Sequence, residues 1–196
     1  MKKYSGFTLL ELMVTVALIG ILLSVGMPSL KVFIQGNQLI ASSNELLSAL
    51  NLARSESIKL NSRVTICESS NGTSCSATGD WSNGWIVFVD ANGDLVGTGE
   101  ACAAINTDCL LRVQDGSGDD QLSIAGVDSN AAAITSFTFS SRGLPKAQNG
   151  SSQSGVYSVC SYDNNDKKIG ERAVVLSLSG RVRISDNSAV ITCQAP

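Results

Sequence analysis

The chain has 196 residues, 43% of them hydrophobic, a formal net charge of −3 and no histidine. This length allows one domain of ordinary size together with a membrane helix. Without histidine, and with no Gly-x-Ser-x-Gly sequence, the chain cannot form a histidine-dependent triad or use a histidine general base, so we expect a protein that is not an enzyme and has no cofactor.

The N-terminal region contains a long apolar segment. From Phe7 to Leu30 the only charged residue is Glu11. A helix needs about 20 apolar residues to span a bilayer, so this segment is long enough to do so. Lys2 and Lys3 precede it and indicate that this end stays in the cytoplasm. A secretory signal peptide would instead have a shorter apolar core, followed by a cleavage site with small residues.

Glu11 is the unusual residue of this segment. A carboxylate in lipid costs about 2.5 kcal/mol or more, so it requires a partner, unless it lies near the helix end and reaches the interface or is protonated. The sequence from Gly6 to Glu11, Gly-Phe-Thr-Leu-Leu-Glu, resembles the signal of type IV pilins and pseudopilins. The resemblance implies that a prepilin peptidase cuts after Gly6 and methylates the new N-terminal Phe7. It also implies that Glu11 pairs with the N-terminal amine of a neighbouring subunit during assembly.

We expect the helix to continue through residues 31–60 with a single apolar face. The apolar residues that share this face recur at helical intervals; they are Leu39, Leu46, Leu50, Ala53 and Leu60. This half of the helix should therefore pack against a globular head. Pro28 should kink the helix or melt it locally.

After residue 60 the apolar period changes to two, which predicts β-strands. The predicted strands are 63–67, 85–89, 95–96, 110–113, 122–127, 134–139, 156–162, 173–178, 181–184 and 190–193. A helix followed by antiparallel strands belongs to the α+β class. The expected parts are a leader at 1–6, a transmembrane or filament-core helix at 7–30, an amphipathic helix at 31–60 and a β-rich head at 61–196.

Six cysteines lie beyond the apolar segment, at Cys67, Cys75, Cys102, Cys109, Cys160 and Cys193. There is no Cys-x-x-Cys, which argues against a zinc site and against thiol redox chemistry. An even number of cysteines in an exported domain predicts three disulfides, and six cysteines allow 15 connectivities. Proximity along the chain favours Cys67–Cys75 and Cys102–Cys109, which leaves Cys160–Cys193.

The sequence Asp90-Ala91-Asn92-Gly93-Asp94 resembles the start of a calcium-binding loop. The EF-hand pattern, however, requires Gly and Glu where Leu95 and Ala101 stand. We therefore favour a hairpin turn here and expect no metal site.

Motifs further along the chain narrow the resemblance to the GspH/FimT group of minor pilins and pseudopilins. These motifs are Asn44-Glu45-Leu46, the run from Leu52 to Ser57, the run from Gly84 to Phe88, Leu111-Arg112, and the run from Ser179 to Arg183. The resemblance implies a pilin-like fold and partnership with other major and minor pilins. It also implies a bacterial inner-membrane protein with its head in the periplasm, which becomes extracellular once it is assembled into a pilus.

Basic residues are concentrated near the C-terminus. Residues 140–196 carry seven basic and four acidic groups, whereas residues 61–139 carry two basic and ten acidic groups. On a strand, Arg181 and Arg183 would point to the same face about 7 Å apart, a spacing that suits neighbouring phosphates. Charged residues can also simply keep an edge strand soluble.

The resemblance gives this pair a specific meaning, because Gly-Arg-x-Arg in the FimT group is linked to DNA binding during natural transformation. Lys167, Lys168 and Arg172 on the preceding hairpin, and more distantly Arg142, would widen the patch. Binding to double-stranded DNA should be weak, salt-sensitive and independent of sequence.

These features predict a minor type IV pilin, located at or near the pilus tip, that supports pilus assembly and binds DNA. Two alternatives stay open. One is a purely structural minor pilin that primes assembly and does not bind DNA. The other is a GspH-type pseudopilin of a type II secretion system.

Overall fold

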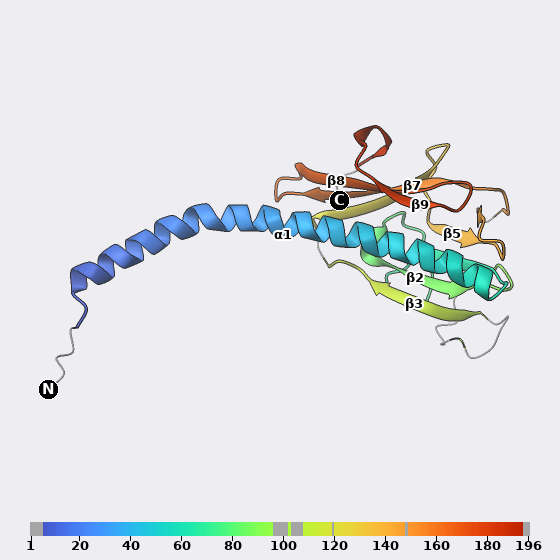
Figure 1. The fold of residues 1–196 in the computed structure, drawn as a ribbon, viewed down its shortest axis with the longest axis horizontal. Helices are drawn as coiled ribbons and strands as arrows, with labels where there is room; N and C mark the ends of the chain where they lie inside the picture. Colours follow the sequence, from blue (N-terminus) through green and yellow to red (C-terminus); the bar gives the residue numbers. More distant parts are fainter. Residues whose placement is uncertain (1–5, 96–101, 103–107, 119, 148, 194–196) are drawn as a thin grey trace. The chain divides into compact units, whose positions relative to one another are not determined.

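The computed structural model describes residues 6–95, 102, 108–118, 120–147 and 149–193, except for the side chains of residues 25–29. The predicted strand 95–96 extends beyond these residues. The chain forms two compact units, one up to Asn37 and one from Gln38 onward. Helix α1 runs from Leu9 to Lys59 and contributes to both units (Figure 1).

In the first unit, α1 is apolar and exposed. Every large apolar side chain described between Phe7 and Ile34 is exposed to solvent. The Thr8 hydroxyl caps the helix by accepting a hydrogen bond from the main-chain N–H of Glu11 at 3.2 Å. The helix stays continuous through Pro28, so the predicted local melting does not occur. Within the described residues, no helix is both long enough and apolar enough to cross a membrane.

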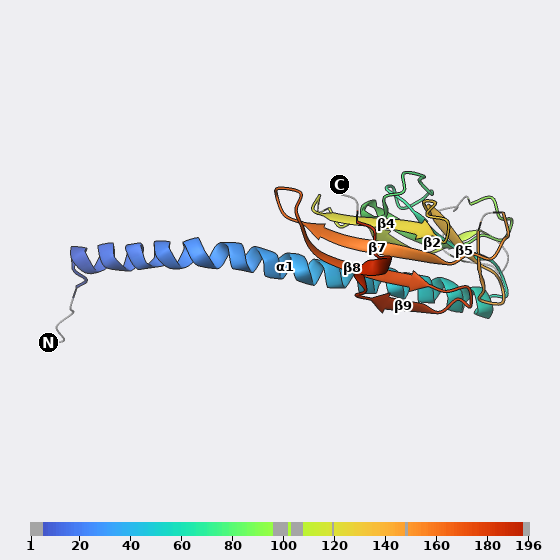
Figure 2. The same cartoon turned by 90° about the horizontal axis from the view of Figure 1, so that it is seen from above.

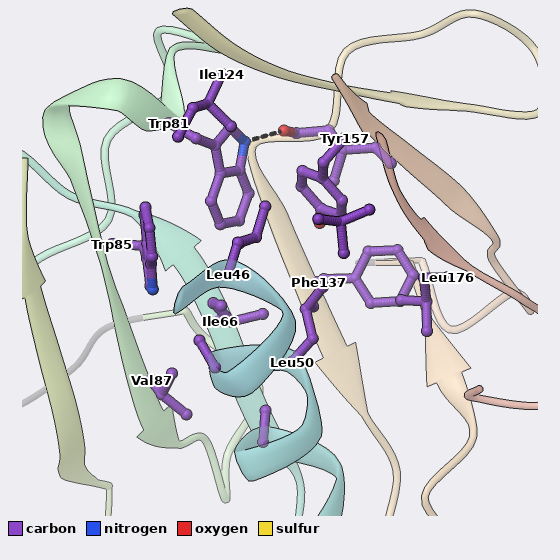
Figure 3. Packing of buried hydrophobic residues seen from close by; sticks show 14 of the residues in the cluster. Leu46, Leu50, Ile66, Trp81, Trp85, Val87, Ile124, Phe137, Tyr157 and Leu176 are labelled. Carbon is purple, nitrogen blue, oxygen red and sulfur yellow. Dashed lines mark hydrogen bonds between the residues drawn. The ribbon is translucent and has the colours of Figure 1, made fainter. Parts of the chain in front are cut away.

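In the second unit, α1 packs its apolar face into the head. Leu46, Leu50 and Ala53 are fully buried and Leu39 nearly so, and Leu60 packs against the same cluster. This confirms the face predicted from helical spacing. Figure 3 shows Leu46 extending from the helix toward Trp81.

The head contains two antiparallel sheets (Figures 1 and 2). One has the strand order β3-β2-β1-β5-β6 and the other β4-β7-β8-β9. The strands of the first sheet are β1 Val64–Glu68, β2 Gly84–Val89, β3 Cys109–Asp115, β5 Ser136–Phe139 and β6 Pro145–Lys146. Those of the second are β4 Leu122–Asp128, β7 Gly155–Tyr162, β8 Lys168–Leu176 and β9 Val182–Ser185. This architecture confirms the predicted α+β, pilin-like class.

Aromatic side chains fill the core of the head. Trp81, in the short 3-10 helix Trp81–Asn83, meets Tyr157 of β7 edge to face at a ring distance of 5.0 Å. The indole N–H of Trp81 donates to the carbonyl of Ile134 at 2.7 Å, the dashed line in Figure 3. This bond satisfies the one polar group that a buried tryptophan carries.

The predicted strand 190–193 is wrong. The chain instead forms a 3-10 turn, Ser188–Val190, and then runs over β7. There the N–H of Thr192 donates to the Ser158 hydroxyl at 2.9 Å, and Cys193 is bonded to Cys160. A segment tied to an inner strand in this way has no free strand edge to pair with, which is why its period-two pattern does not give a strand.

The structure contains the three disulfides that proximity along the chain favoured: Cys67–Cys75, Cys102–Cys109 and Cys160–Cys193. The first closes the loop after β1. The second links the start of β3 to the segment before it. The third anchors the C-terminal segment just described.

Candidate functional site

Arg181 and Arg183 lie at the edge of the second sheet. Among the strands of the described residues, β9 pairs only with β8, with Val182 opposite Leu176 and Ile184 opposite Val174. Val182 and Ile184 pack against the core, whereas both arginines are exposed. The alternation expected from the sequence therefore places the two guanidinium groups on the solvent side of an edge strand.

A tight turn presents Arg181. The N–H of Gly180 donates to the carbonyl of Ser177 at 2.8 Å, and the N–H of Arg181 donates to the Ser177 hydroxyl at 3.2 Å. Gly180 has a φ of +77°, a conformation that glycine adopts without steric cost. The turn therefore fixes the main chain on which Arg181 stands.

Arg142 lies close to this turn. The next residue, Gly143, approaches Gly180 so closely that a Cβ on Gly180 would be 2.4 Å from the Gly143 carbonyl oxygen. Arg142 itself is exposed. The turn between β5 and β6 and the turn between β8 and β9 thus meet, and an arginine flanks the contact on each side.

Lys167 and Lys168 lie away from the point where these two turns meet. Arg183 is opposite Val175 of β8, and Lys168 is seven residues back along that strand, about 23 Å away at 3.3 Å per residue. Lys168 forms an ion pair with Glu171, and its hydrogen bond is the main cause that lowers the pKa of that carboxyl group. Lys167 follows Asp166, which lines an acidic cleft of about 460 Å³ together with Asp80 and Asp120.

Arg172 belongs to the other face of the second sheet. Arg172, Val174 and Leu176 are two positions apart along β8 and therefore share one face, and because Val174 and Leu176 are buried in the core, the Arg172 side chain starts on the core side. Its Nε atom lies 3.4 Å from the Asp186 carboxylate. The expectation that Arg172 widens the patch is not met by this geometry, because strand alternation turns it away from Arg181 and Arg183 and an acid neutralises it.

Arg54 also lies where these two turns meet, and the sequence did not indicate that it belongs to this site. It lies near the end of α1, where its Nη2 atom donates to the carbonyl of Ser179 at 3.3 Å. Its Nε atom is buried and has no hydrogen-bond partner. The two residues are 125 positions apart in the chain, so no local pattern could have connected them.

The N-terminal positions are accessible. Gly6 and Phe7 are exposed and precede the first helical residue, Leu9. Glu11 is also exposed, and the capping bond to Thr8 uses its main-chain N–H and leaves its carboxylate unused. The peptide bond between Gly6 and Phe7, where cleavage is predicted, thus lies in a non-helical segment, the kind of segment that peptidases reach most easily.

The acidic loop after β2 is a closed turn. One carboxylate oxygen of Asp90 accepts from the Thr65 hydroxyl at 3.0 Å and the other from the N–H of Gly93 at 2.8 Å. Both oxygens are therefore occupied within the protein. Across the described part of the chain, no three acidic, cysteine or histidine side chains are grouped as metal ligands would be.

Comparisons with known proteins identify two regions of the chain. The family model described as type II transport protein GspH matches residues 42–180, and the prokaryotic N-terminal methylation motif matches residues 1–27. The first match ends at Gly180, so Arg181 and Arg183 lie just beyond it. No curated protein matches the chain.

Among solved structures, the chain is similar to the type IV minor pilin FimU of Pseudomonas aeruginosa strain PAO1. In one crystal form, in space group P21, the match has 22% identity and a TM-score of 0.52, and covers 78% of this chain and 92% of that chain. In a second form, in space group P65, the identity is 23%, the TM-score 0.49 and the coverage 74% and 90%. The first match shows a shared fold.

Proposed function

This chain belongs to the GspH family of type II transport proteins, and from that premise we propose that it is a minor type IV pilin that binds double-stranded DNA without sequence preference. The methylation motif implies a pilus component anchored in the membrane. Before assembly the protein would sit in the inner membrane with its head in the periplasm. After assembly it would lie at or near the pilus tip.

The role in assembly rests on the N-terminal segment. A helix that is apolar on all sides is stable only where lipid or other protein covers it, and the described apolar side chains up to Ile34 are exposed. Other major and minor pilins are the partners that would cover them in a filament. A prepilin peptidase would cut between Gly6 and Phe7, and the free Glu11 carboxylate would pair with the amine of a neighbouring subunit.

One observation carries the DNA-binding part of the proposal: Arg181 and Arg183 are exposed side by side. The ion pairs found among the described residues involve other cations, namely Lys59, Lys168 and Arg172. The side chains of Arg181 and Arg183 are therefore available to bind an anion from outside the protein. Arginine binds phosphate through paired hydrogen bonds, and contacts of this kind position a protein on DNA without reading its bases. Arg142, at the adjoining turn, is the third proposed contact.

The test is a DNA-binding measurement on the full chain in a non-ionic detergent, with a labelled duplex and fluorescence anisotropy. The parent should bind with a Kd of about 10⁻⁴ to 10⁻⁶ M at moderate salt, and Arg181→Gln with Arg183→Gln should bind more weakly. The matched control is Lys167→Gln with Lys168→Gln, which removes the same charge from the far end of β8 and should bind like the parent. Equal loss in both double variants would indicate a general charge effect and no site at β9.

A second candidate function is that of a GspH-type pseudopilin of a type II secretion system, and the description of the matched family favours it. A third is that of a purely structural minor pilin, whose edge-strand arginines contact neighbouring subunits. Purified pili distinguish the second from the proposal, because only a minor pilin should be found in them, with an N-terminal methylated Phe7. Unchanged DNA binding in the arginine variant would favour the third.

A further inference from the structure

The last turns of α1 form a junction with the two turns that carry the exposed arginines. Gly180 lies against Gly143, as described above. A Cβ on Gly143 would in turn lie 2.7 Å from Ile58 and 3.3 Å from Arg54, and a Cβ on Gly180 would lie 3.0 Å from the Nε atom of Arg54. Three segments far apart in the sequence therefore meet at a point where two of them have glycine, with φ values of +69° at Gly143 and +77° at Gly180.

The Arg54 side chain spans this junction. Its aliphatic part lies beside Gly143, and its guanidinium group reaches the main chain of the turn between β8 and β9 through the bond to Ser179. Its Nε atom is covered and unpaired, and an unpaired buried donor is costly to keep. The half-buried guanidinium group of Arg54 is therefore engaged with the main chain of the turn, whereas the side chains of Arg181 and Arg183 are exposed.

We infer that Arg54 is a positioning residue for DNA binding: it holds the turn from Ser177 to Gly180 in place and thereby fixes where Arg181 points. This inference rests on the proposed function. Arg54 does not contact phosphate in this account. Arg54 links the end of α1 to the turn before β9, so this turn keeps a fixed position relative to the end of the helix.

Salt dependence separates a positioning residue from a contact residue. Each phosphate contact contributes about 0.9 to the slope of log affinity against log salt. Arg181→Gln should therefore lower that slope by about 0.9. Arg54→Gln should lower affinity by roughly 3- to 10-fold, within the range expected for losing one ordinary hydrogen bond, and leave the slope unchanged. Arg112→Gln, on β3 in the other sheet, is the control for loss of one positive charge and should match the parent in affinity.

Amide hydrogen exchange provides a readout independent of DNA. In Arg54→Gln the amides of Gly180 and Arg181, both bonded to Ser177, should exchange faster, while those of β7 keep the parent rate. Arg54→Lys keeps the positive charge but lacks the planar guanidinium group. Its head should still fold, and the amides of Gly180 and Arg181 should exchange faster than in the parent, as in Arg54→Gln.

Each outcome has one meaning. A slope lowered by about 0.9 in Arg54→Gln would show a direct phosphate contact and overturn the positioning role. So would parent-like affinity together with parent-like exchange in both Arg54 variants. If Arg181→Gln with Arg183→Gln binds DNA like the parent, the proposed function fails, while the exchange measurement still decides whether Arg54 holds the turn.

Discussion

Gly180→Ala tests the junction between the two arginine-bearing turns. The substitution places a Cβ at a φ of +77°, which costs about 1–2 kcal/mol for a residue other than glycine. The new atom would also lie 2.4 Å from the Gly143 carbonyl oxygen, which is main chain and cannot rotate away. Forcing an atom into filled space costs typically about 1–3 kcal/mol, so we expect a total loss of roughly 2–5 kcal/mol in the free energy of unfolding.

Gly150→Ala is the matched control. Its φ is +78°, almost the same as that of Gly180, but a Cβ there would meet nothing within 4 Å. It should therefore lose only the conformational part, about 1–2 kcal/mol. Urea unfolding of the oxidised protein measures both, because the two tryptophans, Trp81 and Trp85, are buried in the head and report its unfolding. Equal losses in the two variants would refute the close approach of the two turns.

Three further predictions concern assembly, the disulfides and acid stability. Glu11→Gln should reduce incorporation into pili even though the Thr8 cap, which uses the main-chain N–H of Glu11, is preserved; normal incorporation, measured by quantitative mass spectrometry of purified pili, would argue against pairing with the amine. Cys160→Ser should destabilise the head by about 2–5 kcal/mol in urea, and alkylation of the native parent should find no free thiol. Hydrogen bonds from the N–H groups of Ala132 and then Asn130 lower the pKa of Asp128 below its ordinary value of 3.8. The stability contributed by the ionised Asp128 carboxylate is therefore complete above pH 3.8 and is lost as the pH falls through the lower, folded-state pKa. Asp128→Asn should flatten the acid limb of a curve of stability against pH. An unchanged acid limb would contradict this prediction.

Periodicity predicted those parts of the fold that depend on neighbours in the chain. The apolar face of α1 follows from helical spacing, and the outward direction of Arg181 and Arg183 follows from strand alternation. The disulfide pairing followed because two of the bonds join cysteines that are only eight and seven positions apart. In each of these cases, residues close in sequence determine the outcome.

Contacts between remote segments were not predictable in this way. Arg172 has the same charge as Arg183 and lies on the adjacent strand, but the pairing of Val175 with Arg183 places the two arginines on opposite faces of the sheet, and Arg172 lies 3.4 Å from Asp186. Arg54 reaches Ser179 across 125 residues. Residues 190–193 have the pattern of a strand, but the bond from Cys193 to Cys160 holds that segment across β7 instead.

The most direct test of the DNA-binding account is the salt dependence of duplex binding by Arg181→Gln with Arg183→Gln. If each arginine contacts one phosphate, the slope of log affinity against log salt should fall by roughly 1.8, twice the value of about 0.9 per contact. The control, Lys167→Gln with Lys168→Gln, should keep the parent slope. If the arginine variant has the same slope as the parent, or if the slope falls equally in both variants, the result would contradict a DNA-binding site on β9.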